Sequence, residues 1–361
     1  QRTGLEAGIR PGRGTVAGGG VMTSLDVSAL IDAGPELDEV AASFVTTEYS
    51  SLTRAGAPVT FPVAPYLGAA RDDGTRSLDV STGLTYPLKA ERARRDPRVT
   101  LSFSDPCGSG IDDPPIVVVK GLATVRDGDL VANSARYLRE SFEKFPEAPH
   151  PPAFVQRRMD WYWARIWIEV TPLEVIWWPH GDLTVAPQRR RASGAGVAPP
   201  SDPAPGGRSS GSWNDTPVDW RKRVRGAVDR FGPPVVTTVD SDGWPIPWRA
   251  RAASSSADGF VVTPPVGIEV GAGPASVTFH HHGAGMAFQE NVGLVATASP
   301  TGGGEVELLV HRALTDCSIP HGLRSQIGLL RRGRPLRGRL AREAARRGQA
   351  VPTYDDVAAL I

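Results

Sequence analysis

The sequence predicts a mainly β (α+β) protein with two antiparallel β-barrel-like domains in tandem and helices beside them. First, short apolar or β-branched runs alternate with turns at roughly ten-residue spacing, which is typical of antiparallel barrels and sandwiches. Second, 40 glycines and 33 prolines in 361 residues leave room for few long helices. Third, the pattern of strand and turn begins again after a Pro- and Gly-rich segment in the middle of the chain.

The first half contains five β-branched or apolar runs that end in turn residues. We expect strands within residues 41–49, 59–70, 76–82, 98–105 and 115–128. An amphipathic helix is expected at 128–145, because Leu130, Val131, Ala135, Leu138 and Phe142 recur at helical spacing.

A tryptophan-rich run, 159–179, follows this helix and is expected to be a strand. It places Trp161, Trp163, Arg165 and Trp167 on one face. The aromatic side chains could stack on a flat ligand, or they could simply pack in the core.

Residues 181–216 hold little that could form a core, and we expect a flexible linker there. The domains expected around it are a first barrel at 22–180 and a second at 217–361, which ends in an Arg-rich helix. Residues 1–21 are rich in Gly and Arg and are expected to be a disordered leader outside the fold.

The second half repeats short pieces of the first, which indicates a tandem duplication. Val45-Thr46-Thr47 matches Val236-Thr237-Thr238, Val99-Thr100-Leu101 matches Val277-Thr278-Phe279, and the run from Gly121 loosely matches the run from Gly293. A short helix is expected at 219–232, ahead of the repeated strands.

The composition limits the functional classes. The net charge is only +1, and Cys107 and Cys317 form neither a CxxC motif nor a disulfide framework, so we expect a cytoplasmic protein. No apolar run approaches the ~20 residues of a membrane span. No nucleophile elbow or GxGxxG fingerprint is present, which disfavours a serine hydrolase or a Rossmann dinucleotide site.

A basic segment between two expected strands, residues 81–105, is the strongest functional signal. Between the two strands lie Lys89, Arg92, Arg94, Arg95 and Arg98, with only Glu91 and Asp96 to offset them. Cations beside Ser and Thr hydroxyls suit a phosphate, although charge runs are more often solvated faces. The corresponding segment of the second half, 263–279, has no Lys or Arg.

The order of elements over residues 38–180 resembles the pyridoxamine 5'-phosphate oxidase-like superfamily of FMN-binding split β-barrels. The resemblance rests on the strand at 58–63, the strand end at Ser81 and Thr82, the following Lys89 and the "RRDPRVTLSF" entry into the next strand. It implies two split-barrel-like domains, the second a degenerate copy of the first.

The resemblance implies a cofactor site for FMN, or for the deazaflavin F420, and haem is a less favoured third choice. The residues implied to bind the cofactor are Val59, Thr60, Phe61, Ser81, Thr82, Tyr86, Lys89 and Arg92. No catalytic residue is implied. The second half could replace the partner subunit of a dimer, so we expect either an intramolecular pseudo-dimer or a homodimer, acting on a small-molecule substrate.

The leading hypothesis is therefore a flavin- or deazaflavin-dependent oxidoreductase, and the alternative is a non-catalytic flavin- or haem-binding protein. His280, His281 and His282 form a triplet that could chelate through His280 and His282, but no carboxylate or Cys lies nearby at ligand spacing, so no metal site is expected. The Arg-rich run near the C-terminus is expected to be a solvated or docking helix rather than a nucleic-acid site.

Overall fold

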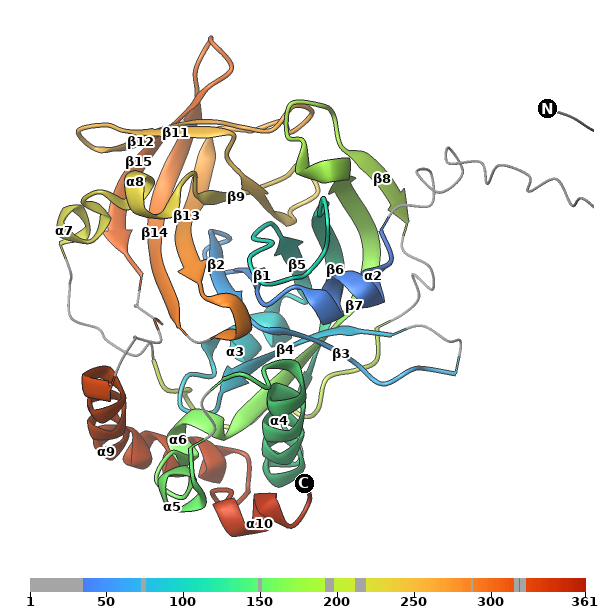
Figure 1. The fold of residues 1–361 in the computed structure, drawn as a ribbon, viewed down its shortest axis with the longest axis vertical. Coiled ribbons are helices and arrows are strands. Elements are labelled where there is room, and N and C mark those ends of the chain that lie inside the picture. The colour runs from blue at the N-terminus through green and yellow to red at the C-terminus, as the bar shows by residue number, and fades with distance from the viewer. Residues whose placement is uncertain are drawn as a thin grey trace, which may run out of the picture. The chain divides into compact units, whose positions relative to one another are not determined.

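Antiparallel pairing joins the strands into two sheets, one from each half of the chain (Figure 1). The computed structural model describes residues 35–72, 76–148, 151–191, 198–211, 219–286, 288–314, 318 and 323–361, with the backbone alone at 323–332 and Arg334. The predicted leader, 1–21, and the residues up to 34 lie outside the described residues.

The first sheet has the strand order β2-β1-β5-β6-β7-β4-β3, and β8 pairs with β7. Its strands are β1 (Thr47–Leu52), β2 (Pro58–Val63), β3 (Pro65–Leu67), β4 (Leu78–Gly83), β5 (Arg98–Phe103), β6 (Ile116–Arg126), β7 (Arg165–Trp178) and β8 (Gln188–Arg191). Each expected strand of the first half overlaps an observed one, but the prediction for 41–49 was wrong at its start, because residues 41–43 belong to the helix that ends at Ser43 and β1 begins at Thr47.

The second sheet has the order β10-β9-β13-β14-β15-β12-β11. Its strands are β9 (Val235–Val239), β10 (Pro245–Arg249), β11 (Ala252–Ser255), β12 (Gly259–Thr263), β13 (Gly273–His282), β14 (Gln289–Pro300) and β15 (Val306–Ala313). Apart from β8, each strand takes the place of one strand in the first sheet. This shared order confirms the predicted mainly β class with two barrel-like halves.

The helices lie between and after the strands. They are α2 (Leu37–Ser43), α3 (Leu88–Arg95), α4 (Leu130–Lys144), α5 (Ala153–Gln156), α6 (Asp160–Trp163), α7 (Trp220–Val224), α8 (Ala227–Phe231), α9 (Leu323–Arg346) and α10 (Tyr354–Ala358), with 3-10 turns at Pro179–Gly181 and Ala284–Met286. The prediction of a helix at 128–145 is confirmed by α4, whose first turn is capped by the Asp129 carboxylate accepting from the Ala132 N–H at 2.9 Å.

The basic segment forms a crossover from β4 to β5 that contains α3. The matching connection in the second half, from β12 to β13, has no helix in any of its residues. The two halves thus differ at the position where the cofactor site is predicted.

The prediction of one continuous strand through the tryptophan-rich run was wrong at its start. Trp161 and Trp163 belong to the helical turn α6, and the strand β7 begins at Arg165. The alternation of residues could not reveal this, because Trp161, Trp163, Trp167, Trp177 and Trp178 are all at most 4% exposed. These rings pack in the core, so they are not available to stack on a ligand.

The short helix expected at 219–232 is in fact two helices, α7 and α8. Gly226 separates them with a φ of +66°, a left-handed conformation that ends one helix before the next begins.

The residue matches predicted between the two halves are shifted in register in the structure. Val99 pairs with Gly121 in β6, but the matching Val277 pairs with Leu294 rather than Gly293. The hydrophobic pattern of a strand that is buried on both faces does not specify its pairing register.

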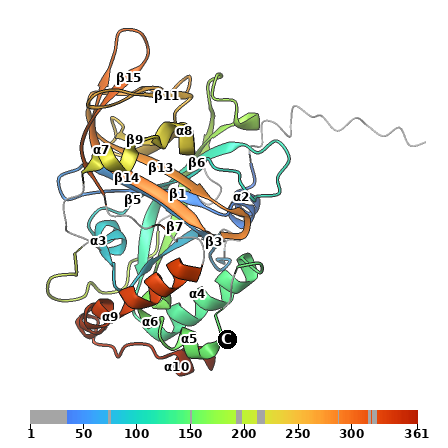
Figure 2. The same ribbon diagram turned by 60° about the vertical axis from the view of Figure 1, so that its left-hand side comes forward.

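Helix α9 was expected to belong to the second barrel, but its described side chains pack on the first half. Leu336, Leu340 and Ala344 join the hydrophobic core of the first sheet, together with Val357 of α10. Figure 2 shows α9 and α10 beside α4, α5 and α6. Of the two expectations for the Arg-rich helix, docking on the fold is the one confirmed for these residues.

The described parts of the segment expected to be a flexible linker also contact the first sheet. Strand β8 pairs with β7 from Gln188 to Arg191. Farther on, the Asp202 carboxylate accepts hydrogen bonds from the backbone N–H groups of Asp127 and Gly128 at 2.8 and 2.7 Å. The Pro- and Gly-rich composition predicted the lack of a core here, but it could not show that backbone and carboxylate groups would hold the segment in place.

The two halves pack against each other through β1, β2 and β5 on one side and β9, β10 and β13 on the other. The Thr60 and Thr237 hydroxyls are 2.5 Å apart at the centre of this contact, and the Thr278 hydroxyl donates to the Thr60 carbonyl at 3.4 Å. Buried hydroxyl pairs of this kind define how the two sheets are positioned against each other.

Asp79 on β4 is a buried acid whose environment sets a pH dependence of stability. Its side chain is 1% exposed, and it accepts from Arg136 at 2.7 Å through Oδ2. Its Oδ1 has no hydrogen-bond partner in the described part of the chain. Loss of water on burial outweighs the attraction of Arg136 and raises the pKa of Asp79 to about 6.

We expect Asp79→Asn to remove a pH-dependent destabilisation. Because the folded pKa lies above the unfolded one, Asp79 binds its proton more tightly in the folded state, and its contribution to stability falls as pH rises from about 4 to about 6. Relative to wild type, the Asn variant should gain about 2 kcal/mol in unfolding free energy between pH 4.5 and 7.5. Urea unfolding at both pH values measures this difference. As a control, Glu140→Gln, which alters the other partner of Arg136, should show no such change. If the difference in unfolding free energy between wild type and Asp79→Asn were the same at both pH values, the prediction would be wrong.

Candidate functional site

The five cations of the crossover do not act alike. Arg98 forms an ion pair with its neighbour Asp96, in which Arg98 NH2 lies 2.7 Å from Asp96 Oδ2. Arg95 donates to the Leu52 carbonyl at 2.8 Å. Arg94 forms a buried ion pair with Asp127, so these three cations stabilise the fold locally.

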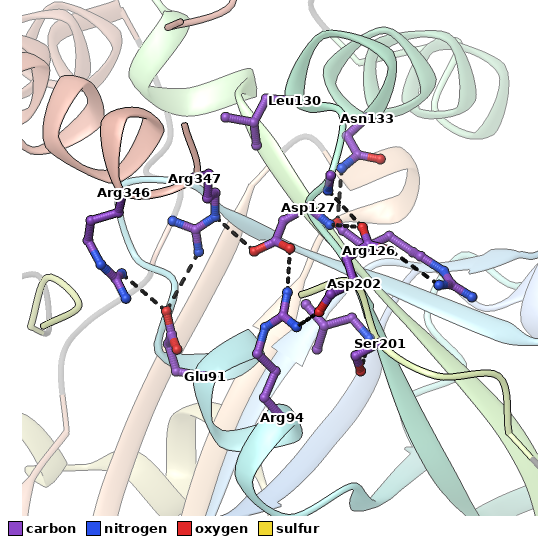
Figure 3. Close-up of polar contacts among 12 residues, drawn as sticks. Glu91, Arg94, Arg126, Asp127, Leu130, Asn133, Ser201, Asp202, Arg346 and Arg347 are labelled. Atoms are coloured by element: carbon purple, nitrogen blue, oxygen red, sulfur yellow. Dashed lines mark hydrogen bonds and ion pairs between the residues drawn. The ribbon is translucent and has the colours of Figure 1, made fainter. Parts of the chain in front are cut away.

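The Arg94–Asp127 pair is part of a buried ionic cluster that fastens the C-terminal helix (Figure 3). Asp127, which follows β6, also accepts at 2.8 Å from Nε of Arg347, which directly follows α9. Arg346 and Arg347 in turn reach Glu91 of α3 at 3.2 and 3.6 Å. Two of the charges on α3, those of Arg94 and Glu91, are therefore balanced by ion pairs within the protein.

Lys89 and Arg92 lie on a different side of α3, over the ring of Phe61. The Lys89 Nζ is 4.9 Å from the ring centroid, and the Arg92 Cζ is 6.0 Å from it. Phe61 comes from β2, the strand of the first sheet that packs on β13 of the second half. The structure thus brings together three of the predicted cofactor residues at the border between the halves.

Among the residues that the structure describes, no carboxylate balances the positive charge around Arg92. Arg92, Arg95 and Arg312 form no ion pair within the described residues. Burial lowers the pKa of Arg92, and repulsion from Arg95 and Arg312 lowers it further. The neighbouring Tyr49 would raise this pKa only if its hydroxyl were ionised. Since burial raises the pKa of Tyr49, that side chain stays neutral and supplies no negative charge at neutral pH.

Arg312, which lies on β15, was not predicted as a site residue. It belongs to the second half and becomes a neighbour of α3 only when the two halves pack. A single Arg in the run "VELLVHRAL" carries no signal of its own in the sequence.

The other predicted cofactor residues have internal roles. Val59 is 2% exposed, and the Thr60 hydroxyl is bonded to Ser50 at 2.8 Å as well as to Thr237. The Thr82 hydroxyl donates to the Tyr86 carbonyl at 2.9 Å and closes the turn before α3.

Ser81 and Tyr86 complete the predicted set, and both are partly buried. Ser81 lies on β4 opposite Trp167, and the Tyr86 ring is 5.7 Å from the Arg339 guanidinium of α9. Among the predicted cofactor residues, the hydroxyl groups of Thr60 and Thr82 are thus already engaged within the protein.

A second polar cluster, which the sequence did not predict, lies where β1 and β5 meet β13. Glu48 Oε1 accepts from His280 Nε2 at 2.7 Å, from Ser104 Oγ at 2.6 Å and from Arg249 NH2 at 3.3 Å. Asp105 Oδ2 is 3.3 Å from His282 Nδ1. The expectation that no carboxylate accompanies the histidines was therefore wrong, because the carboxylates come from the other half of the chain.

One sequence signal could have pointed to this cluster. Residues 102–104 align with the histidine triplet in the repeat, and equivalent strand ends meet when two similar halves pack face to face. Asp105 directly follows that aligned position. His280 and His282 do share one face of the strand as predicted, with ring planes 8° apart, while His281 is exposed.

Both carboxyl groups of this cluster have a pKa below the ordinary value. Burial alone would raise the pKa of Glu48, but the hydrogen bond and charge of His280, with Arg249 and Ser104, lower it below its ordinary value. The same balance holds at Asp105, where burial is outweighed by His282, His280 and Arg249 and the pKa is lowered. Two negative charges thus face two imidazoles and one guanidinium.

A polar pocket of about 410 Å³ lies elsewhere, between β8 and the β9–β10 turn. Arg189, Arg190, Arg191, Lys120, Leu173, Glu174, Asp242 and Trp244 line it. None of the predicted cofactor residues is among them. Lys120 there bonds to Asp240 at 2.9 Å and to Glu174 at 3.2 Å, so much of its charge is balanced.

The sequence matches no known family model and no curated protein. Solved structures with similar parts include the conserved hypothetical protein Rv2991 from Mycobacterium tuberculosis, which is 17% identical with a TM-score of 0.28 over 44% of this chain and 86% of that one. A structure named F420 reductase is 18% identical with a TM-score of 0.29 over 39% of this chain and 98% of that one. A pyridoxamine 5'-phosphate oxidase-related, FMN binding protein from Nostoc punctiforme is 12% identical with a TM-score of 0.28 over 48% of this chain and 100% of that one.

Within the described part of the chain, no helix combines the length and the apolar character that crossing a membrane requires.

Proposed function

We propose that the chain binds the phosphate of an anionic flavin-type cofactor, FMN or F420, beside α3, and that it is an oxidoreductase acting on a small molecule. The observation that carries this proposal is the largely buried Arg92, which has no carboxylate partner among the described residues and lies with Lys89 over Phe61. A buried cation without a counter-charge is costly, and a phosphate would remove that cost.

The residues present fit the anionic end of such a cofactor. Lys89 supplies an ammonium, and Arg92 a planar fork that can hold two phosphate oxygens. Arg312 adds positive potential from the second half. The predicted resemblance of residues 38–180 to FMN-binding split barrels points to the same place on the chain.

The chain's own residues position the cofactor rather than react with substrate. When bound, the cofactor ring supplies the hydride or electron transfer. Phe61 provides an apolar surface beside the phosphate, and the packed second half excludes water from that side of β2.

The proposal is tested by purifying the protein from a host that makes both FMN and F420, recording its absorption spectrum and identifying the released molecule by mass spectrometry. We expect one cofactor per chain, because the second half lacks the basic crossover. Lys89→Ala should weaken retention at least about 10-fold, as loss of one charge-assisted contact does. Arg98→Ala, which removes an ion pair within the chain, should not.

Three results would contradict parts of this proposal. A protein that takes up neither FMN nor F420 would overturn it entirely, and two cofactors per chain would overturn the degenerate role of the second half. A bound cofactor that is never reduced and reoxidised with any substrate would favour the alternative, a non-catalytic flavin-binding protein.

A further inference from the structure

Three hydrogen-bond acceptor positions converge at the border between the two halves. Asp105 Oδ2 lies 3.3 Å from His282 Nδ1 and 3.8 Å from His280 Nδ1, and all three atoms are within 4.8 Å of one another. Both imidazoles are fully buried, while the Asp105 side chain is 16% exposed. His280 Nδ1 has no hydrogen-bond partner within the described residues, although it is buried.

The tautomer of His280 follows from its contact with Glu48. The carboxylate can only accept, so the 2.7 Å contact places the hydrogen on His280 Nε2. Arg249 NH2 also lies 3.3 Å from this nitrogen. If Nε2 accepted from Arg249 instead, two acceptors would face each other at 2.7 Å, which is repulsive. In the neutral ring, Nδ1 therefore presents a lone pair to the cluster.

The tautomer of His282 is set in the same way by the backbone. His282 Nε2 lies 3.1 Å from the Cys107 carbonyl, which can only accept, so Nε2 carries the hydrogen. Nδ1 is again left as an acceptor. The Thr46 hydroxyl, 3.3 Å from that nitrogen, is able to donate to it, but at the long end of the hydrogen-bond range.

Asp105 is oriented by a turn. Its Oδ1 accepts from the backbone N–H of Cys107 at 3.1 Å, an arrangement typical of an Asx turn. This contact leaves Oδ2 directed to the two histidines. The Cys107 thiol donates to the His282 carbonyl at 3.4 Å, so it is occupied away from the cluster.

We propose that Asp105, His280 and His282 bind one divalent transition-metal ion of the Zn²⁺ and Fe²⁺ class. Two imidazole nitrogens and one carboxylate suit these ions better than Ca²⁺ or Mg²⁺, which prefer oxygen ligands. Tetrahedral ligands at about 2.1 Å from a metal are about 3.4 Å apart, close to the separations in the cluster.

The groups behind the histidines match a second shell. A histidine that binds a metal through one nitrogen usually donates its other N–H to a carboxylate or a carbonyl. Glu48 has this role for His280, and the Cys107 carbonyl has it for His282. Three protein ligands leave a fourth position for water, and the partial exposure of Asp105 gives access to it.

Such an ion would join the two halves of the chain, since Asp105 follows β5 and the histidines are on β13. Its test is independent of any enzymatic activity. The full-length protein is freed of metal with a chelator, titrated with Zn²⁺ by calorimetry, and titrated with Co²⁺ while its visible absorption is recorded.

We expect one Zn²⁺ per chain, a rise in melting temperature on binding, and ligand-field bands with Co²⁺. Glu48→Gln should weaken Zn²⁺ affinity about 10–100-fold, and Asp105→Asn and His282→Ala should weaken it further. His281→Ala, at the exposed neighbour, should change nothing. X-ray absorption of the Zn²⁺-loaded wild type should show nitrogen and oxygen neighbours only, including two imidazoles.

Absence of Zn²⁺ and Co²⁺ binding by the folded wild type would overturn the site. Binding that survives in both Asp105→Asn and His282→Ala would also overturn it. Because the wild-type titration and the X-ray absorption need no variant, a variant that fails to fold does not prevent the decision.

Discussion

Asp127→Ala should destabilise the protein by about 3–5 kcal/mol, the usual cost of removing one partner from a buried ion pair. Asp127 is 2% exposed and accepts from two buried guanidiniums, Arg94 and Arg347, which are 9% and 2% exposed. Without the carboxylate, Arg94 would remain in the interior without its counter-charge, and Arg347 would keep only its ion pairs with Glu343 and Glu91. Urea unfolding at neutral pH measures the loss.

The same substitution should also loosen the C-terminal helix. Arg347 lies at the end of α9, and Asp127 connects it to α3 through Arg94 (Figure 3). Amide hydrogen exchange in α9 and α10 should therefore rise more than in the sheets. Asp355→Ala is the matched control, because its ion pair with Arg157 is exposed, at 71% and 55%, and its loss should leave the unfolding free energy nearly unchanged. An Asp127→Ala protein as stable as this control would show that the cluster does not hold α9 in place.

Arg92→Met should have opposite effects on cofactor binding and on the stability of the cofactor-free protein. Removing the guanidinium should lower the affinity for the phosphate-bearing cofactor about 10–100-fold, as expected for loss of a bidentate charge-assisted contact. Without cofactor, the variant should be at least as stable as wild type, since Arg92 is a largely buried cation with no ion pair in the described structure.

Arg94→Met is the matched control on the same helix. Arg94 forms its ion pair with Asp127 and also donates to the Asp202 carbonyl, so its loss should destabilise the protein. Its cofactor affinity should be unchanged under conditions where the variant is folded. Equal losses of stability in the two variants would mean that Arg92, like Arg94, is a structural residue.

The site was only partly predictable. Lys89, Arg92 and Phe61 were singled out from the order of strand, turn and basic helix, and they do lie together. Thr60 and Thr82 were chosen on the same pattern, but their hydroxyls are used in the contact between the halves and in a turn. A residue type and its place on a strand do not reveal which partner it meets.

The sequence by itself determined the mainly β class, the position of α4 and the doubling of one strand pattern. These features depend on local periodicity, on turn residues and on a helix cap, which act between residues close in the chain. The absence of Lys and Arg from the second half's crossover, 263–279, was equally visible, because it needs only a comparison of composition.

Only the tertiary structure decided which charges are balanced and which are not. Arg94 and Arg92 are two residues apart on one helix, yet one meets Asp127 and the other meets a ring and two further cations. Asp105 and His282 meet across 177 positions of the chain. Electrostatic energy depends on distance and burial, which are set by how the two halves pack, and no pattern local to either half contains that information.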